Sequence, residues 1–97
     1  MSTYTKLFDK YELTLKTSLS SDKKLTVNLY VGFKQSGTVN LGKGYFYIGE
    51  SSYQAYSGGE IFYFSQGHQE KIGPYTLNVS GYAGQKIMVK GSIQIDG

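Results

Sequence analysis

Two alternating runs occupy residues 11–33, which read YELTLKTSLSSDKKLTVNLYVGF. Every second residue from Tyr11 to Leu19 is apolar except Thr17, and the same spacing returns from Leu25 to Phe33. A period of two is typical of strands that have one buried and one solvated side. Residues 20–23, Ser-Ser-Asp-Lys, separate the runs and favour a turn. This stretch therefore predicts a β-hairpin whose buried sides face the same way.

The remaining sequence predicts further short strands. Residues 38–41, 45–49, 60–65, 74–79 and 87–95 carry similar runs, separated by glycine-rich or polar segments. Residues 50–59 predict a loop, with one short strand around residues 53–56 as an alternative. No window has helical periodicity. The sequence predicts an all-β fold, an antiparallel β-sandwich of about seven to eight short strands, with a small β-barrel as the alternative.

Several local expectations accompany this prediction. Residues 60–65 are apolar on both sides, which predicts a central strand or one that lies under a neighbouring element. Pro74 is expected to open the strand that follows it, since its missing N–H costs least there. Gly91 predicts a bulge or a bend in the last strand, and residues 82–85 predict a turn.

Length and composition point to a single domain covering residues 1–97. The chain has no cysteine, so its stability must come from packed apolar area without disulfides. Residues 1–9 lack the pattern of a signal peptide, and no apolar run approaches the length of a membrane span. The expectation is a cytoplasmic or processed soluble form with no membrane span.

The charge pattern argues against nucleic-acid recognition. The net charge of +3 comes from ten lysines, no arginine and seven scattered acids. Arginine supplies the bidentate contacts to phosphate and guanine that lysine makes poorly. Dispersed lysines are typical of sheets that stay soluble and keep their edges unpaired. We therefore expect no nucleic-acid partner.

Catalytic and metal-binding motifs are weak. The only histidine, His68, lies in a polar stretch, and the acids are far apart in sequence. Residues 37–44 read GTVNLGKG, which lacks the hydroxyl that must follow the lysine of a phosphate-binding loop. A single histidine and no cysteine argue against structural zinc. The sequence predicts no enzyme, no cofactor and no metal site, although calcium held by loop carboxylates stays open.

Tyrosine is the most unusual component, at ten of 97 residues. The alternation places Tyr11 and Tyr75 on buried faces, where they are expected to pack. Other tyrosines fall outside core positions: Tyr30, Tyr45 and Tyr47 on polar strand faces, and Tyr53, Tyr56 and Tyr82 in loops or turns. Exposed tyrosine suits recognition because its ring stacks while its hydroxyl forms hydrogen bonds. Strand propensity and cross-strand packing explain the same residues without a ligand.

The leading functional prediction is a non-catalytic, lectin-like module that binds a carbohydrate or glycoconjugate. Sugars present C–H patches beside hydroxyls, which match tyrosine faces and polar side chains. The candidate ligand-binding residues form a predicted loop-rich edge: Tyr53, Gln54, Tyr56, Gln66, His68 and Gln69. Tyr45 and Tyr47 are the alternative, as a platform on a sheet face.

The second prediction is a structural or assembly protein. In this interpretation the tyrosines mediate contacts with another protein surface or between copies in a homo-oligomer. Exposed strand edges and aromatic surface both favour such association.

Overall fold

The computed structural model describes residues 2–82 and 86–96. Its strands are β1 (Ser2–Leu7), β2 (Tyr11–Leu19), β3 (Lys24–Phe33), β4 (Gly37–Ile48), β5 (Ser51–Tyr56), β6 (Glu60–Phe64), β7 (Gln69–Asn78) and β8 (Val89–Asp96). A 3₁₀ turn, η1 (Ser80–Tyr82), follows β7. The turn expected at residues 82–85 lies mostly outside the described residues. No helix in the described part of the chain is long and apolar enough to cross a membrane.

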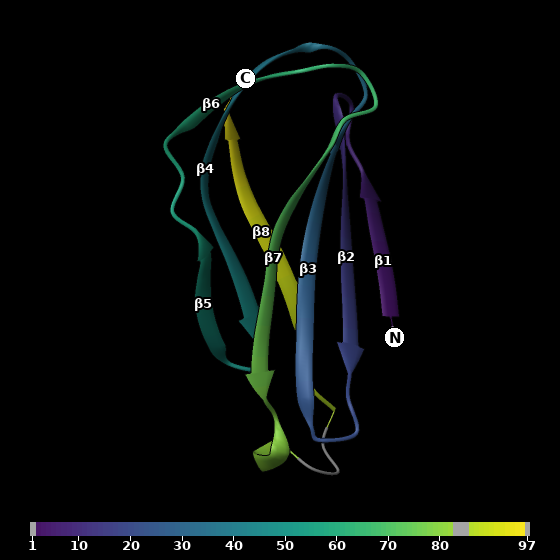
Figure 1. The fold of residues 1–97 in the computed structure, drawn as a ribbon, viewed down its shortest axis with the longest axis vertical. Coiled ribbons are helices and arrows are strands. Elements are labelled where there is room, and N and C mark those ends of the chain that lie inside the picture. Colours follow the sequence, from purple (N-terminus) through teal and green to yellow (C-terminus); the bar gives the residue numbers. More distant parts are fainter. Residues whose placement is uncertain (1, 83–85, 97) are drawn as a thin grey trace.

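The strands form two antiparallel sheets that face each other (Figure 1). Sheet A has the order β1-β2-β3-β7. In sheet B, β4 is the central strand, with β8 on one edge and with β5 and β6 sharing the other. The predicted antiparallel sandwich is confirmed. The barrel alternative is wrong, because the two sheets do not join by strand pairing into a closed cylinder.

The predicted hairpin of residues 11–33 forms as β2 and β3. Tyr11 lies opposite Phe33 and Leu19 opposite Leu25, so the alternating apolar residues share the face of sheet A that is turned towards sheet B, and only Leu19 beside the turn is exposed on it. In the turn, the Ser20 hydroxyl donates to Asp22 and the Ser20 backbone N–H donates to the Lys24 carbonyl. These bonds let the polar residues between the runs fix the hairpin register.

The core lies between β3 and the centre of sheet B. All five apolar side chains on the inner face of β3 are buried: Leu25, Val27, Leu29, Val31 and Phe33. Phe46 and Ile48 of β4 meet them from the opposite sheet and are fully buried. Because β3 and β4 are central strands, neighbours on both sides and the facing sheet exclude water from this layer.

Sheet B has an irregular centre. The sequence predicts a break at Gly42-Lys43-Gly44, but β4 runs through these residues as one strand of 12 residues. The irregularity is a register shift between Leu41 and Gly44 in the pairing with β8. At the same level, the strand that pairs with β4 on the edge away from β8 changes from β6 to β5. In the loop that connects β5 to β6, the Gly59 N–H donates to the Leu41 carbonyl at 2.9 Å.

Three other local expectations are wrong. β6 is not central, since it pairs only with β4 in the described structure and leaves Ile61 and Tyr63 72% and 74% exposed. Pro74 lies inside β7 and not at its start, at an irregularity opposite Val27–Leu29. Gly91 pairs with Phe46 without a register shift; a Cβ there would come within 3.2 Å of Leu15, so glycine serves close sheet packing instead.

Candidate functional site

The predicted site residues lie at three separate places in the fold. Gln66, His68 and Gln69 lie at one end of the sandwich, where β6 connects to β7. Tyr53 and Tyr56 lie on β5 and pack against the core. The third group, on the solvent face of sheet B, consists of Gln54, Tyr45 and Tyr47. The structure therefore does not bring the six residues of the predicted loop edge together.

Three connections meet at one end of the sandwich, which we call the loop end. They are the β1–β2 turn, the β3–β4 turn and the β6–β7 loop, and they lie at the top of Figure 1. The Lys34 backbone N–H donates to the Lys10 carbonyl at 3.0 Å, and the Lys34 ammonium donates to the Phe8 carbonyl at 2.6 Å. These bonds fix the first turn against the second.

The β6–β7 loop is held to the same end by backbone hydrogen bonds. The Gly67 N–H donates to the Phe33 carbonyl at 2.8 Å, and the Phe33 N–H donates to the His68 carbonyl at 2.9 Å. The Gln66 N–H donates to the Ser36 hydroxyl at 3.1 Å. The three connections consequently form one hydrogen-bonded surface, and the strands below hold them in place.

A pocket of about 530 Å³ opens at the loop end. Its apolar lining comes from Phe33, Val39 and Ile95, which belong to three different strands. Polar groups complete the lining: Lys10, Tyr11, Gln35, Ser36 and Thr38, together with the backbone of Gly37. An apolar floor with a few convergent polar groups is the usual composition of a small-molecule site.

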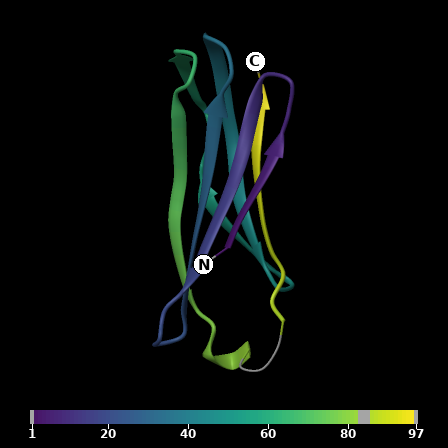
Figure 2. The same ribbon diagram turned by 90° about the vertical axis from the view of Figure 1, so that its right-hand side faces the viewer.

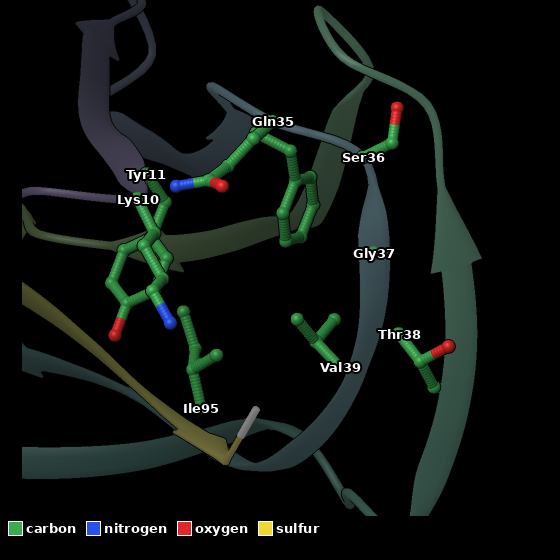
Figure 3. A pocket seen from close by; sticks show the side chains of 9 residues that line it. Lys10, Tyr11, Gln35, Ser36, Gly37, Thr38, Val39 and Ile95 are labelled. Carbon is green, nitrogen blue, oxygen red and sulfur yellow. The ribbon is translucent and has the colours of Figure 1, made fainter.

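Figure 3 shows how these side chains surround the pocket. Lys10 and Tyr11 lie on one side, Val39 on the other, and the Gln35 amide projects between them. Within the residues that the structure describes, the Lys10 ammonium, the Tyr11 hydroxyl and the Gln35 amide make no hydrogen bond. The ammonium, the amide and the phenol hydroxyl are therefore free to form hydrogen bonds with a ligand that lies on the apolar floor.

His68 borders this site through the aromatic residues beneath it. Phe33 stacks on Phe64 with ring centroids 4.0 Å apart, and the His68 ring lies 5.0 Å from Phe64. The His68 Nε2 is 3.3 Å from a Glu70 carboxylate oxygen, and both residues are accessible to solvent. Nothing here pairs a histidine with a nucleophile, and no group of three metal-ligating side chains occurs in the described ranges.

Tyr53 is distant from His68, and its side chain packs against the core. Its ring lies 4.9 Å from that of Tyr75, and both rings pack against the core. His68 directly precedes β7, and Tyr75 lies seven residues further along the chain, which corresponds to about 23 Å at the rise of a strand. Tyr75 packs as the alternation predicts, and Tyr53 lies on β5, the short strand that the sequence allows within its loop. Burial gives Tyr53 a packing role that needs no ligand.

Tyr45 and Tyr47 form the predicted platform on sheet B. They lie on its solvent face with ring centroids 6.3 Å apart, and Tyr47 is 38% exposed. Gln54 lies opposite Tyr45, while Lys90 lies opposite Tyr47. A shallow depression of about 300 Å³ beside Tyr47 is also lined by Met88 and Lys90. The platform is a second candidate site with aromatic and polar character.

The sequence identified only part of the loop end. The polar residues of the β6–β7 loop predict a recognition site there, whereas no sequence pattern marks Lys10, Gln35 and Ser36, which line the pocket. Each lies in or beside a turn, which gives no indication that the turns meet. The alternation did place Phe33 and Ile95 on buried faces, and these residues form the floor where their strands end.

Comparison of the chain with protein-family models, with curated proteins and with solved structures found no match.

Proposed function

We propose that the protein is a non-catalytic binding module that recognises a carbohydrate through the loop-end pocket. The observation that carries this proposal is the arrangement of Lys10, Tyr11 and Gln35 around the apolar floor of Phe33, Val39 and Ile95. A pyranose ring has an apolar C–H face and a circle of hydroxyls, so it matches both parts of the lining.

Rigidity supports the same proposal. The polar lining groups come from the β1–β2 and β3–β4 turns and the strand ends beside them. Hydrogen bonds join these turns to each other and to the β6–β7 loop, and Phe33 beneath them is 4% exposed. A preformed pocket spends less binding free energy on ordering its loops. The Lys10 ammonium adds a positive charge, which favours sugars that carry a carboxylate or sulfate.

A glycan array tests this function. We expect the wild-type protein to bind a subset of glycans, and we expect Gln35→Ala to weaken that binding at least tenfold. Gln54→Ala is the matched control, since it removes the same amide from the solvent face of sheet B. Both variants must retain the wild-type circular dichroism spectrum.

The outcomes separate the two candidate sites. Loss of binding in Gln35→Ala alone supports the loop-end pocket, whereas loss in Gln54→Ala alone assigns the ligand to the Tyr45–Tyr47 platform. Binding to no glycan on the array contradicts carbohydrate recognition.

A second function, self-association, is favoured by one observation. Ile61 and Tyr63 project from the solvent face of sheet B, and each is more than two-thirds exposed. Adjacent exposed apolar side chains on a flat sheet are a common basis for protein contacts. Light scattering tests this alternative: an oligomer that dissociates in Ile61→Ser supports it, and a monomer at high concentration contradicts it.

A further inference from the structure

The two sheets of the sandwich differ in width. Sheet A has four strands side by side, while sheet B has β8, β4 and then β5 or β6 at any level. On the side away from β7, β1 and β2 extend past β8, as Figure 1 shows. Sheet B therefore lacks a strand beneath the edge of sheet A.

A groove occupies the position of the missing strand, and Figure 2 views the molecule from this side. Its main part has a volume of about 390 Å³ and lies between Leu13, Leu15 and Leu29 of sheet A and Val89 of β8. A second part of about 230 Å³ shares Tyr4, Leu15 and Val89 with the first, so the groove continues along β8. Tyr4 remains 68% exposed above it.

The edge of β8 along this groove is available for strand pairing. In the described structure β8 pairs only with β4, so the N–H and C=O groups on its other edge have no strand partner. An unpaired edge beside an uncovered apolar face is the arrangement used for peptide binding by strand addition.

The charges of the groove indicate the chemistry of its occupant. Lys6 lines it from sheet A, and Lys90 lies at its rim on β8, where it shares the solvent face of sheet B with Tyr47; the lining contains no acidic residue. The Lys6 ammonium lies 5.5 Å from the centroid of the Phe8 ring, and no acidic residue pairs with it in the described structure. A segment that enters the groove must therefore be neutral or acidic near these two lysines.

We propose that this groove binds an extended peptide segment that adds to sheet B along β8. The segment carries apolar side chains at alternate positions, which cover Leu13 and Leu15, and carboxylates that face Lys6 and Lys90. The backbone edge distinguishes this occupant from an amphiphile such as a fatty acid, which has no groups to pair with β8.

A second copy joined edge to edge through β8 fits less well. An antiparallel β8–β8 pair related by a twofold axis places both copies of sheet A on the same side of the joined sheet B. Each copy would then bring its overhanging β1 and β2 to the same junction. These overhanging strands oppose a β8–β8 pair, whereas a single added strand brings no such overhang.

The test uses a capped eight-residue peptide of sequence EVTVTVTE and the same peptide with lysine for both glutamates. We expect the acidic peptide to shift the amide NMR signals of Val89–Gly91 and Leu13–Leu15, and to bind at least tenfold more tightly than the lysine peptide. Lys90→Glu should lower affinity for the acidic peptide at least tenfold. Lys71→Glu makes the same charge change outside the groove and should have no such effect.

Three results would overturn the proposal. The first is no shift of the β8 amides with either peptide at millimolar concentration. The second is tighter binding of laurate at the same amides, which would assign the groove to an amphiphile. The third is a peptide-free dimer, detected by light scattering, whose β8 amides are protected from exchange.

Discussion

Replacing the two glycines of the β5–β6 loop by alanine separates backbone strain from steric overlap. Gly58 and Gly59 have φ of +81° and +85°, a region that L side chains rarely adopt. Each Ala substitution therefore adds strain of about 1–2 kcal/mol. Their surroundings differ: a Cβ at Gly58 would lie 2.5 Å from the Gly42 carbonyl carbon, whereas a Cβ at Gly59 meets nothing within 4 Å.

The overlap at Gly58 cannot be relieved by a side-chain rotation, because the neighbouring atoms belong to the β4 backbone. We expect Gly58→Ala to cost about 1–3 kcal/mol more than Gly59→Ala, the usual range for overpacking a close contact. For a domain of this size, each kcal/mol lowers Tm by about 4–8 °C.

Thermal and urea denaturation of both variants measure this difference, with Gly59→Ala as the matched control for strain. A Gly58→Ala variant that melts at least 4 °C below Gly59→Ala supports the close crossing of the β5–β6 loop over β4. Equal midpoints for the two variants would refute it.

Three further stability predictions follow from burial and backbone geometry. Phe46 is fully buried, so Phe46→Ala should lower the free energy of unfolding by about 3–5 kcal/mol in urea denaturation. Tyr47→Ala, on the solvent side of β4, should lower it by about 1 kcal/mol or less. Equal losses in the two variants would contradict the assignment of the two faces of β4. Tyr53→Ala should cost about 2 kcal/mol because the ring packs on Tyr75, and an unchanged midpoint would argue against that packing. Lys23 has φ of +63°, so Lys23→Gly should raise stability by up to about 1 kcal/mol; a lower Tm would show that this backbone is not strained.

The alternation of residues 11–33 was sufficient to predict β2, β3 and the side of each that faces the core. The prediction is right because β3 is a central strand, so neighbouring strands and the facing sheet bury every apolar side chain on its inner face. β1 was not predicted. Its residues Ser2–Leu7 are all exposed and mostly polar, so its position comes from pairing with β2 and not from an apolar pattern of its own.

Residues 60–65 show the opposite limitation. Their apolar side chains predicted a central strand, yet Ile61 and Tyr63 face solvent on an edge strand. The composition of a strand shows how apolar its side chains are, but it does not show how many strands pair with it in the sheet. These two exposed side chains are the ones on which the proposed self-association depends.

None of the eight residues that the sequence predicts for the site lines the loop-end pocket, although Gln66 and His68 lie at the same end of the sandwich. Polar residues in a loop, such as Gln66 and His68, are visible in a sequence. The meeting of Lys10 with Gln35 depends on the packing of two turns that are 25 positions apart, and no local pattern encodes it. The polar residues 50–59 predict a loop with one short strand around residues 53–56 as an alternative, and the structure has that strand as β5.

The most direct test of the account is amide NMR mapping with the glycan that the array identifies. The account predicts shifts concentrated at Lys10–Tyr11, at residues 34–38 and at Ile95, where the loop-end pocket lies. Shifts confined to Tyr45, Tyr47 and their neighbours on sheet B, with the loop end unchanged, would contradict it.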